Sequence, residues 1–532
     1  MTFKNKNELI YLLALGAFFV AIMMFSWIGY YGSDDMTYFA GGKGWLNDFP
    51  YVGQNHWTLR HTIVIPMALV FALAGISEFA LVSPVILYYI GLLSIVYLIA
   101  REYFDYRTSA VAVFLILTLP LMATQSTVVV PDFAEVFFCL LSLWLFLRSL
   151  RGSYQARLLI LSGVAAGLGW LTRETVIFFL FGYVLLFLAG FRLPRLKYFY
   201  IGLGFFTIVA AEMLYFGLVE GNFLHRIVVD FGTHLQVDAG KGMAAMGDGI
   251  GRLAGRTEVG GHGMLTRTGN LSVGRLFDPL LVILANQEFL LFYFFAAPCA
   301  VIAMLRKKKS IRERTAIIAL ATVGLGWFFS LYLQIGMTLL PRYFMLPSVI
   351  VAMLCASTLV DKFWQRPLLL GLILCGFAVN GFTGVYLDNR NPLFAERALT
   401  DYAANNDRMI VTDPETLRRG GFLYEVAGVD QQISSDLDQG HCLLFHNPRY
   451  LVHGFLVGSG AGPDRDARLS AMSVYLPQSD WSVIKEIRPG DRWIRVILDA
   501  LKLNTIIPTE IYRRIVSPNF AVTIYDLCGT RD

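Results

Sequence analysis

Long apolar stretches separated by short polar turns dominate the first 387 residues of the chain. A helix needs about 20 apolar residues to cross a bilayer, and several stretches approach or reach that length. We predict eleven transmembrane helices, at residues 9–29, 80–100, 108–128, 131–147, 158–172, 175–191, 198–219, 286–305, 315–336, 343–360 and 367–387. The pattern is typical of a mainly α-helical, polytopic membrane protein.

Two longer segments between these spans have a different pattern. In residues 30–79, the stretch "TYFAGGKGWLND" favours a short amphipathic helix, and "HTIVIPMALVFALAG" favours an apolar helix of 15 residues. Fifteen residues are short for a span, so we expect the second helix to lie along the membrane surface. In the loop 220–285, twelve of the 43 residues from 232 to 274 are Gly. That composition predicts a mobile loop or lid.

After residue 387 the hydropathy falls, and short alternating segments replace the apolar runs. The stretches "RMIVTD", "HCLLFHN", "WSVIKEI" and "AVTIYDL" favour strands, and "AERALTDYAANN" and "DRWIRVILDALKL" favour helices. We therefore divide the chain into a transmembrane domain, 1–387, and a soluble α/β domain, 388–532.

Composition supports the membrane assignment. Hydrophobic residues make up 56% of the 532 residues and charged residues only 16%, whereas soluble domains carry about 25% charged residues. The net charge of +5 is small for this length, so nothing indicates binding to nucleic acid. The distribution of basic residues is more informative than their sum.

Sixteen Lys and Arg residues lie in five alternate short loops, whereas the short turns between those loops are almost free of them. Because short basic loops stay in the cytoplasm, we predict a cytoplasmic amino terminus. The segments 30–79, 220–285 and 388–532 are then extracytoplasmic. The compact loops favour a bacterial inner membrane. Cys442 and Cys528 would both lie in this outer domain, where a disulfide and two buried free thiols are equally compatible with the sequence.

Ionisable side chains gather at the predicted outer ends of the spans. A charge at membrane depth is costly, so such a residue is a functional candidate by default. A single one is more often a headgroup anchor, but five groups fall on the same predicted face. Together they predict a cavity lined by carboxylates and guanidinium groups: Asp34 and Asp35; Arg60 and His61; Asp132 and Glu135; Arg173 and Glu174; Arg342 and Tyr343.

Five stretches that carry these residues, in order over about residues 10–360, resemble the polyprenyl-phosphate-sugar-dependent glycosyltransferases of the GT-C fold. The family includes protein O-mannosyltransferases and lipid A aminoarabinose transferases. The matching stretches are "SDDMTYFAGGKGW", "LRHTIVIPMALVFALAGISEF", "VVPDFAEVFF", "GLGWLTRETVIFF" and "LPRYFMLPSVIVAML". The chain departs from the family pattern where Asp35 replaces Glu, Arg60–His61 replace Lys-Pro, and Arg173–Glu174 replace Lys-Gly or Lys-Pro.

The resemblance implies a GT-C type fold and transfer of a sugar from a polyprenyl-phosphate donor to an acceptor hydroxyl outside the cytoplasm. Asp34 is then the candidate general base, supported by Asp35. Arg60, Arg173 and Arg342 are candidates for holding the lipid phosphate, because guanidinium groups donate paired hydrogen bonds and stay charged. The acceptor is a glycan, a lipid or a protein. No cofactor is certain, and the resemblance leaves a divalent metal open; no residue is assigned as a metal ligand.

Two other classes compete with the transferase. A secondary transporter also places charges at membrane depth, but it usually shows an internal repeat with matched broken helices, and none is visible here. A non-catalytic membrane scaffold accounts for the soluble domain but not for the polar groups. The transferase is the interpretation that accounts for both features.

Overall fold

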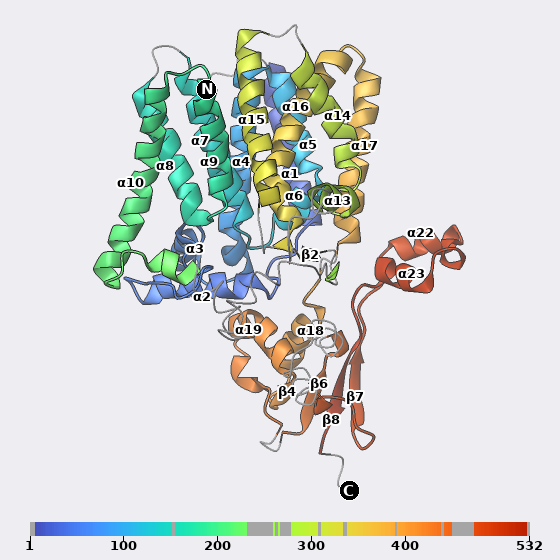
Figure 1. Cartoon of the computed structure of the whole chain (residues 1–532). Helices are drawn as coiled ribbons and strands as arrows, with labels where there is room; N and C mark the ends of the chain where they lie inside the picture. The colour runs from blue at the N-terminus through green and yellow to red at the C-terminus, as the bar shows by residue number, and fades with distance from the viewer. Residues whose placement is uncertain are drawn as a thin grey trace, which may run out of the picture. The chain divides into compact units, whose positions relative to one another are not determined.

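A computed structural model describes most of the chain: residues 6–151, 155–230, 259–260, 264–266, 278–306, 310–333, 338–388, 391–437, 441–449 and 473–528. Contacts divide it into two units (Figure 1). The first, called the membrane unit, comprises residues 1–29 and 37–388. The second, called the C-terminal unit, comprises residues 389–532 together with the short segment 30–36.

The membrane unit is built from long apolar helices, and a helix occurs at each of the eleven predicted spans. Among the described residues, six helices are long and apolar enough to cross a membrane by length and composition. For one of them, the candidate span Pro341–Phe363, the preceding 3₁₀ turn is included. The helices are α1 (Lys6–Phe25), α4 (Glu78–Tyr103), α5 (Tyr106–Leu117), α7 (Asp132–Ser149), α8 (Ala156–Thr172), α9 (Val176–Leu188), α10 (Arg195–Val219), α14 (Phe292–Leu305), α15 (Ile311–Leu333), α16 (Met345–Phe363) and α17 (Pro367–Leu387).

The predicted span 108–128 is not one continuous helix. Helix α5 ends at Leu117, and a separate short helix, α6 (Pro120–Gln125), follows after two residues. Proline has no N–H and its ring clashes with the preceding turn, so a helix starts at Pro120 more readily than it passes through it. The hydroxyl of Thr118 donates to the carbonyls of Phe114 and Leu115, which satisfies part of the end of α5.

Both helices predicted within residues 30–79 are present. They are α2 (Asp34–Asn47) and α3 (His61–Ala74). The part of α2 that belongs to the membrane unit and α3 lie at one end of the helix bundle, whereas the amino terminus lies at the opposite end (Figure 1). This arrangement places the residues around α3 at the same end as the starts of α7 and α9 and the end of α8.

Close backbone packing brings α8 and α10 together. A Cβ atom added at Gly163 of α8 would lie 2.0 Å from the carbonyl oxygen of Ile201, and one added at Gly204 of α10 would lie 2.0 Å from that of Ile160. Only glycine permits this approach, as is common where membrane helices cross. The crossing sets where Glu212, two turns further along α10, lies relative to the end of α8.

The rest of the membrane unit packs around α16, most of whose residues are buried. A 3₁₀ turn, η2 (Pro341–Phe344), leads into it and carries Arg342 and Tyr343. Short strands precede this turn: β3 (Thr338–Leu339) pairs antiparallel with β2 (Met264–Thr266), which pairs with β1 (Val259–Gly260). Helix α13 (Asp278–Ala285) lies before α14. The predicted lid character of 220–285 rests mainly on residues outside those described.

The C-terminal unit contains a five-stranded mixed sheet, which confirms the predicted sheet-containing domain. Its order is β5-β4-β6-β8-β7; β4 is parallel to β5 and β6, and the other pairs are antiparallel. The strands are β4 (Ile410–Thr412), β5 (Ile433–Ser434), β6 (Leu443–His446), β7 (Ser482–Ile487) and β8 (Val522–Asp526); the helices are α18 (Phe394–Ala403), α19 (Pro414–Ala427), α22 (Ile494–Ala500) and α23 (Thr509–Val516).

Helix α19 was not predicted, although its ends carry standard signals. The carboxylate of Asp413 accepts hydrogen bonds from the N–H groups of Glu415 and Thr416, at 3.1 and 2.9 Å, and Pro414 occupies the first helical position. The helix ends at Gly428, whose φ of +69° is the left-handed conformation that glycine favours. The adjacent glycines 420–421 and the many charges obscured the apolar stripe in the sequence.

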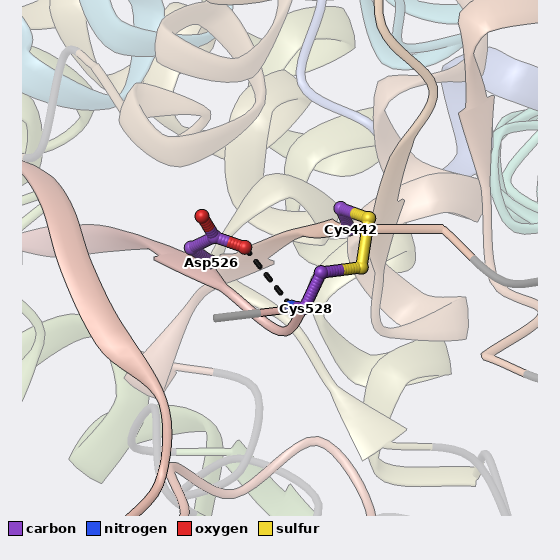
Figure 2. Close-up of a disulfide and its surroundings, with 3 residues drawn as sticks. All are labelled: Cys442, Asp526 and Cys528. Carbon is purple, nitrogen blue, oxygen red and sulfur yellow. Dashed lines mark hydrogen bonds between the residues drawn. A yellow bond between two sulfur atoms is a disulfide. The ribbon is translucent and has the colours of Figure 1, made fainter. Parts of the chain in front are cut away.

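The structure resolves the alternatives for Cys442 and Cys528 in favour of a disulfide. Cys442 and Cys528 are bonded, with Cα atoms 5.0 Å apart (Figure 2). Cys442 precedes β6 and Cys528 follows its antiparallel neighbour β8, so the bond joins the paired ends of two strands. The carboxylate of Asp526 accepts a hydrogen bond from the N–H of Cys528 at 3.0 Å, which fixes the turn after β8.

Candidate functional site

An ion-pair cluster lies where the start of α7, the end of α8 and the turn η2 meet; we call it the open cluster. Arg173 follows α8 in extended backbone and donates to the carboxylate of Asp132, the first residue of α7, at 2.9 Å. The ring of Tyr343 lies against the Arg173 guanidinium, 4.4 Å from its centroid. The Nε atom of Arg342 lies 4.0 Å from the second oxygen of Asp132.

The two arginines of the open cluster differ in exposure. The side chains of Arg173 and Asp132 are 6% and 2% exposed, whereas that of Arg342 is 25% exposed. Arg173 is thus fixed by a buried carboxylate and an aromatic face, whereas Arg342 approaches the same carboxylate less closely and is partly exposed. One carboxylate therefore lies between two guanidinium groups that differ in accessibility.

Arg60 lies near this cluster at the start of α3. Its guanidinium donates to the hydroxyl of Tyr38 on α2 and lies 5.6 Å from the centroid of that ring. Arg60 also interacts electrostatically with Glu135 and with Glu174. Glu135 itself accepts a hydrogen bond from the hydroxyl of Thr175. Arg60 therefore connects α2 and α3 with the acids of α7 and the α8–α9 turn.

A second ion-pair cluster, which we call the closed cluster, is centred on Arg226. Its Nε donates to both carboxylate oxygens of Glu212 at 3.0 Å, and one terminal nitrogen donates to Glu174 at 3.0 Å. The other terminal nitrogen donates to the carbonyls of Leu59 and Leu171 at 2.7 and 3.3 Å. Every nitrogen of this guanidinium therefore has a partner, and Arg226 is only 4% exposed.

His61 and Asp230 complete the closed cluster. The Nδ1 atom of His61 lies 3.1 Å from Glu212, so the ring is an additional partner for that carboxylate. Asp230 lies beside Glu174 and Arg226. Burial, together with repulsion from Glu174, raises the pKa of Asp230 to about 8, although Arg226 opposes the shift. A pKa near 8 favours the protonated form of the Asp230 carboxyl at neutral pH, which avoids a third negative charge beside Glu174 and Glu212.

Asp34 and Asp35 belong to the segment 30–36 and are described within the C-terminal unit. Arg419 of α19 donates to the carbonyl of Tyr31 at 3.0 Å, and the rings of Tyr30 and Phe422 lie 4.6 Å apart. Gly32 has a φ of +68°, and a Cβ atom there would lie 2.8 Å from the carbonyl oxygen of Arg419. These contacts hold the segment closely against α19.

The two adjacent carboxylates have different surroundings. Asp35 is buried and accepts hydrogen bonds from the N–H groups of Tyr31, Gly32 and Ser33, the last two at 3.2 and 2.6 Å. Burial raises the pKa of Asp35 to about 6, although these donors and Arg419 favour the charged form. Asp34 is the first residue of α2 and is only half-buried. Asp35 therefore shapes the loop, whereas Asp34 stands at a more accessible position.

The contacts divide the predicted membrane-unit residues between the two clusters. Asp132, Arg173, Arg342 and Tyr343 meet in the open cluster; His61 and Glu174 meet in the closed cluster; Arg60 and Glu135 lie between them. The structure does not add Asp34 or Asp35 to either cluster, because both belong to the other unit.

Sequence reasoning missed Tyr38, Glu212 and Arg226. Glu212 carried a usable signal, because it is an acid inside the predicted span 198–219, where a charge needs a partner. Arg226 carried none, since it follows the span in an ordinary polar stretch. Among the described residues, no group of three His, Cys, Asp or Glu side chains is arranged to hold a metal ion. A groove of about 700 Å³ in the C-terminal unit, beside Arg397, Tyr402 and Lys485, contains none of the predicted site residues.

Solved structures show which fold this arrangement belongs to. The apo oligosaccharyltransferase of Archaeoglobus fulgidus matches with a TM-score of 0.57 at 12% identity, covering 98% of this chain and 89% of its own. ArnT from Cupriavidus metallidurans bound to undecaprenyl phosphate matches with a TM-score of 0.55 at 14% identity, covering 84% and 94%. The chain therefore has the GT-C fold, as the sequence predicted.

A family model supports the resemblance more locally. The model described as dolichyl-phosphate-mannose-protein mannosyltransferase matches residues 62–216, which include Asp132, Glu135, Arg173 and Glu212. Among solved structures, AglB from Archaeoglobus fulgidus in complex with an inhibitory peptide and a dolichol-phosphate matches with a TM-score of 0.53 at 12% identity, covering 99% of this chain and 89% of its own. A comparison with curated protein sequences gives no significant match. The resemblance to polyprenyl-phosphate-dependent glycosyltransferases is thus confirmed.

Proposed function

We propose that the protein is a membrane glycosyltransferase that moves a sugar from a polyprenyl-phosphate donor to an acceptor hydroxyl. The observation that carries the proposal is the open cluster. Two guanidinium groups lie within 4.0 Å of one carboxylate, and two of these three residues, Asp132 and Arg173, fall in the stretch that matches the mannosyltransferase model. The similarity to ArnT bound to undecaprenyl phosphate and to AglB with dolichol-phosphate supports a lipid-linked donor.

The donor phosphate gains negative charge as the sugar leaves it, and guanidinium groups neutralise that charge best. Arg342 is the proposed phosphate contact, because its side chain is partly exposed. Arg173 is committed to Asp132 and Tyr343, so it acts mainly by fixing Asp132 and adding positive potential. Arg60 supplies a third guanidinium, oriented by Tyr38.

In the proposed reaction, the acceptor oxygen forms a bond to C1 of the sugar, and the bond from C1 to the phosphate oxygen breaks. The bonding electrons leave with the lipid phosphate, and the acceptor proton passes to a carboxylate. Asp34 is the proposed base because it is the more accessible acid of the pair. Asp35 would hold the loop.

The matched pair Asp34→Asn and Asp35→Asn tests this division of roles. Amide for carboxylate preserves volume and removes the proton acceptor. We expect Asp34→Asn to lower kcat by about 10²–10⁴-fold, the range for loss of a general base, with donor binding unchanged. Asp35→Asn should instead lower thermal stability, because an amide nitrogen cannot accept from the loop N–H groups. Near-normal turnover of Asp34→Asn with a labelled polyprenyl-phosphate sugar would exclude it as the base.

We further propose that the chemistry takes place on the extracytoplasmic face of a bacterial inner membrane. The asymmetry of Lys and Arg between alternate loops supports this orientation. Single cysteines at Ser310 and Ser482, both exposed, test it in a chain whose exposed Cys375 is replaced by Ser. An impermeant thiol reagent should label position 482 but not position 310 in intact cells. The opposite labelling would invert the topology.

A further inference from the structure

The hairpin formed by α22 and α23, residues 491–516, exposes an unusual amount of apolar surface. It follows β7 and precedes β8, at the end of the two-stranded ribbon that these strands form (Figure 1). Soluble domains rarely expose contiguous apolar patches, and those that occur mark interaction surfaces. The exposed apolar side chains here, with their exposed fractions, are Trp493 (54%), Val496 (72%), Ile497 (44%), Leu501 (62%), Ile506 (75%) and Ile511 (51%).

The first four of these residues lie on a single helical face. Their spacing of three and four residues places Trp493, Val496, Ile497 and Leu501 in one stripe along α22. The hairpin has a small interior of its own, because Leu498 of α22 and Val516 of α23 are buried. The backbone N–H of Arg492 also donates to the carbonyl of Val516 at 2.9 Å. The exposed residues of the stripe are therefore not needed for the interior packing of the hairpin.

The polar side of the hairpin is basic and internally paired. Arg495 lies between Asp491 and Asp499, 3.5 Å from the latter, and the hydroxyl of Tyr512 donates to Asp499 at 2.6 Å. Both acids thus have partners on the hairpin itself. Residues 491–516 contain five Lys and Arg and three Asp and Glu. The net charge of the hairpin is therefore positive, which favours a partner with an anionic surface.

We infer that this hairpin binds the surface of a bilayer that contains anionic phospholipid, as an interfacial anchor for the C-terminal unit. An apolar stripe with a Trp and a basic opposite face is the pattern of helices that lie in the interface plane. The chain is itself a membrane protein, so a bilayer is always tethered close to this domain, and the effective concentration of that partner is high. A second copy of the chain or another protein could cover the apolar stripe without any positive charge on the hairpin, so the basic side favours the anionic bilayer.

Fluorescence quenching in the full-length protein tests the inference. An environment-sensitive dye is attached at Val496→Cys, or at the control position Val483→Cys, which is 61% exposed on β7 of the same unit. Cys375 is replaced by Ser in both. The protein is placed in nanodiscs of phosphatidylcholine alone or with phosphatidylglycerol. Spin-labelled lipid should quench the dye at 496 at least about twofold more than at 483, and more strongly with the anionic lipid.

Two outcomes would overturn the inference. Equal quenching by aqueous iodide at both positions, with no effect of spin-labelled lipid, would show a water-exposed hairpin. Protection of position 496 from both quenchers would show that a second copy of the chain covers the stripe. Because the dye at 483 reports on the folded sheet, a misfolded preparation is recognised separately. The readout does not depend on glycosyl transfer, so it stands apart from the proposed enzymatic activity.

Discussion

The open and closed clusters contain the same kinds of residue but differ in how closely their central guanidinium groups contact the acids and in how far these groups are exposed. In the closed cluster, Arg226 contacts two carboxylates and two backbone carbonyls, and its side chain is 4% exposed. In the open cluster, Asp132 pairs closely with Arg173 but only loosely with Arg342, whose side chain is 25% exposed. The buried, closely contacted Arg226 is suited to a structural role, whereas the partly exposed Arg342 is accessible to a ligand.

This difference follows from the cost of burying ions. A charge removed from water loses several kcal/mol of solvation, which only a complete set of partners recovers. The closed cluster has that set and links α8, α10 and the segment after α10. In the open cluster, the side chain of Arg342 is 25% exposed, so an anionic headgroup could reach its guanidinium. Substitutions in the two clusters should therefore affect different measurements.

The largest effect is expected from Arg226→Ala, which should destabilise the membrane unit. The variant leaves the buried carboxylate of Glu212 with too few partners, and breaking a buried pair typically costs about 3–5 kcal/mol. The melting temperature in detergent should fall markedly. Arg226→Lys should recover only part of the loss, because an ammonium cannot reproduce the contacts of a planar fork. A melting temperature close to that of the wild type would mean that the closed cluster is not structural.

A smaller effect, confined to activity, is expected from Arg342→Ala. Loss of a charge-assisted contact to phosphate typically costs about 1.5–3 kcal/mol, or roughly tenfold to a hundredfold in transfer rate. The melting temperature should change little, because Asp132 keeps its close partner Arg173. Arg342→Lys should restore part of the activity. A large fall in stability with normal transfer would reverse the roles assigned to the two clusters.

A further effect, on the pH dependence of stability, is expected through Asp230 at the edge of the closed cluster. Its folded pKa of about 8 lies above the ordinary value of 3.8. The folded state therefore binds the proton more tightly than the unfolded state between these values. Its contribution to stability is present at low pH and is lost as pH rises from about 4 to 8.

Melting temperatures of the wild type and Asp230→Asn, measured from pH 5 to 9, check this prediction. The amide does not titrate, so the difference in stability between variant and wild type should grow in favour of the variant as pH rises to 8. A constant difference across this range would show that the carboxyl of Asp230 has an ordinary pKa.

The helical framework could be predicted because its signals are local. Apolar runs gave the spans, and the alternation after residue 387 gave β4, β6, β7 and β8. The break between α5 and α6 was missed because Pro120 lies within an otherwise continuous apolar run. The conspicuous end signals of α19, Asp413 and Gly428, were available but were outweighed by its charged composition.

The candidate site was predictable as a set of residues but not as a set of contacts. The ion pair between Asp132 and Arg173 joins residues 41 positions apart, and no spacing rule encodes such a pair. Glu212 and Arg226 could be connected to Glu174 only by the crossing of α8 and α10. The different roles proposed for Asp34 and Asp35 likewise depend on where the backbone N–H groups of Tyr31, Gly32 and Ser33 lie, which the sequence does not specify.

The central claim, that the open cluster binds a lipid phosphate, is tested most directly by binding of undecaprenyl phosphate to Arg342→Ala. A matched control is Arg157→Ala, which removes an exposed arginine after a short basic loop. We expect undecaprenyl phosphate to raise the melting temperature of the wild type and of Arg157→Ala at the same concentrations. Arg342→Ala should need at least about tenfold more lipid for the same shift. Equal stabilisation of all three proteins would contradict the claim.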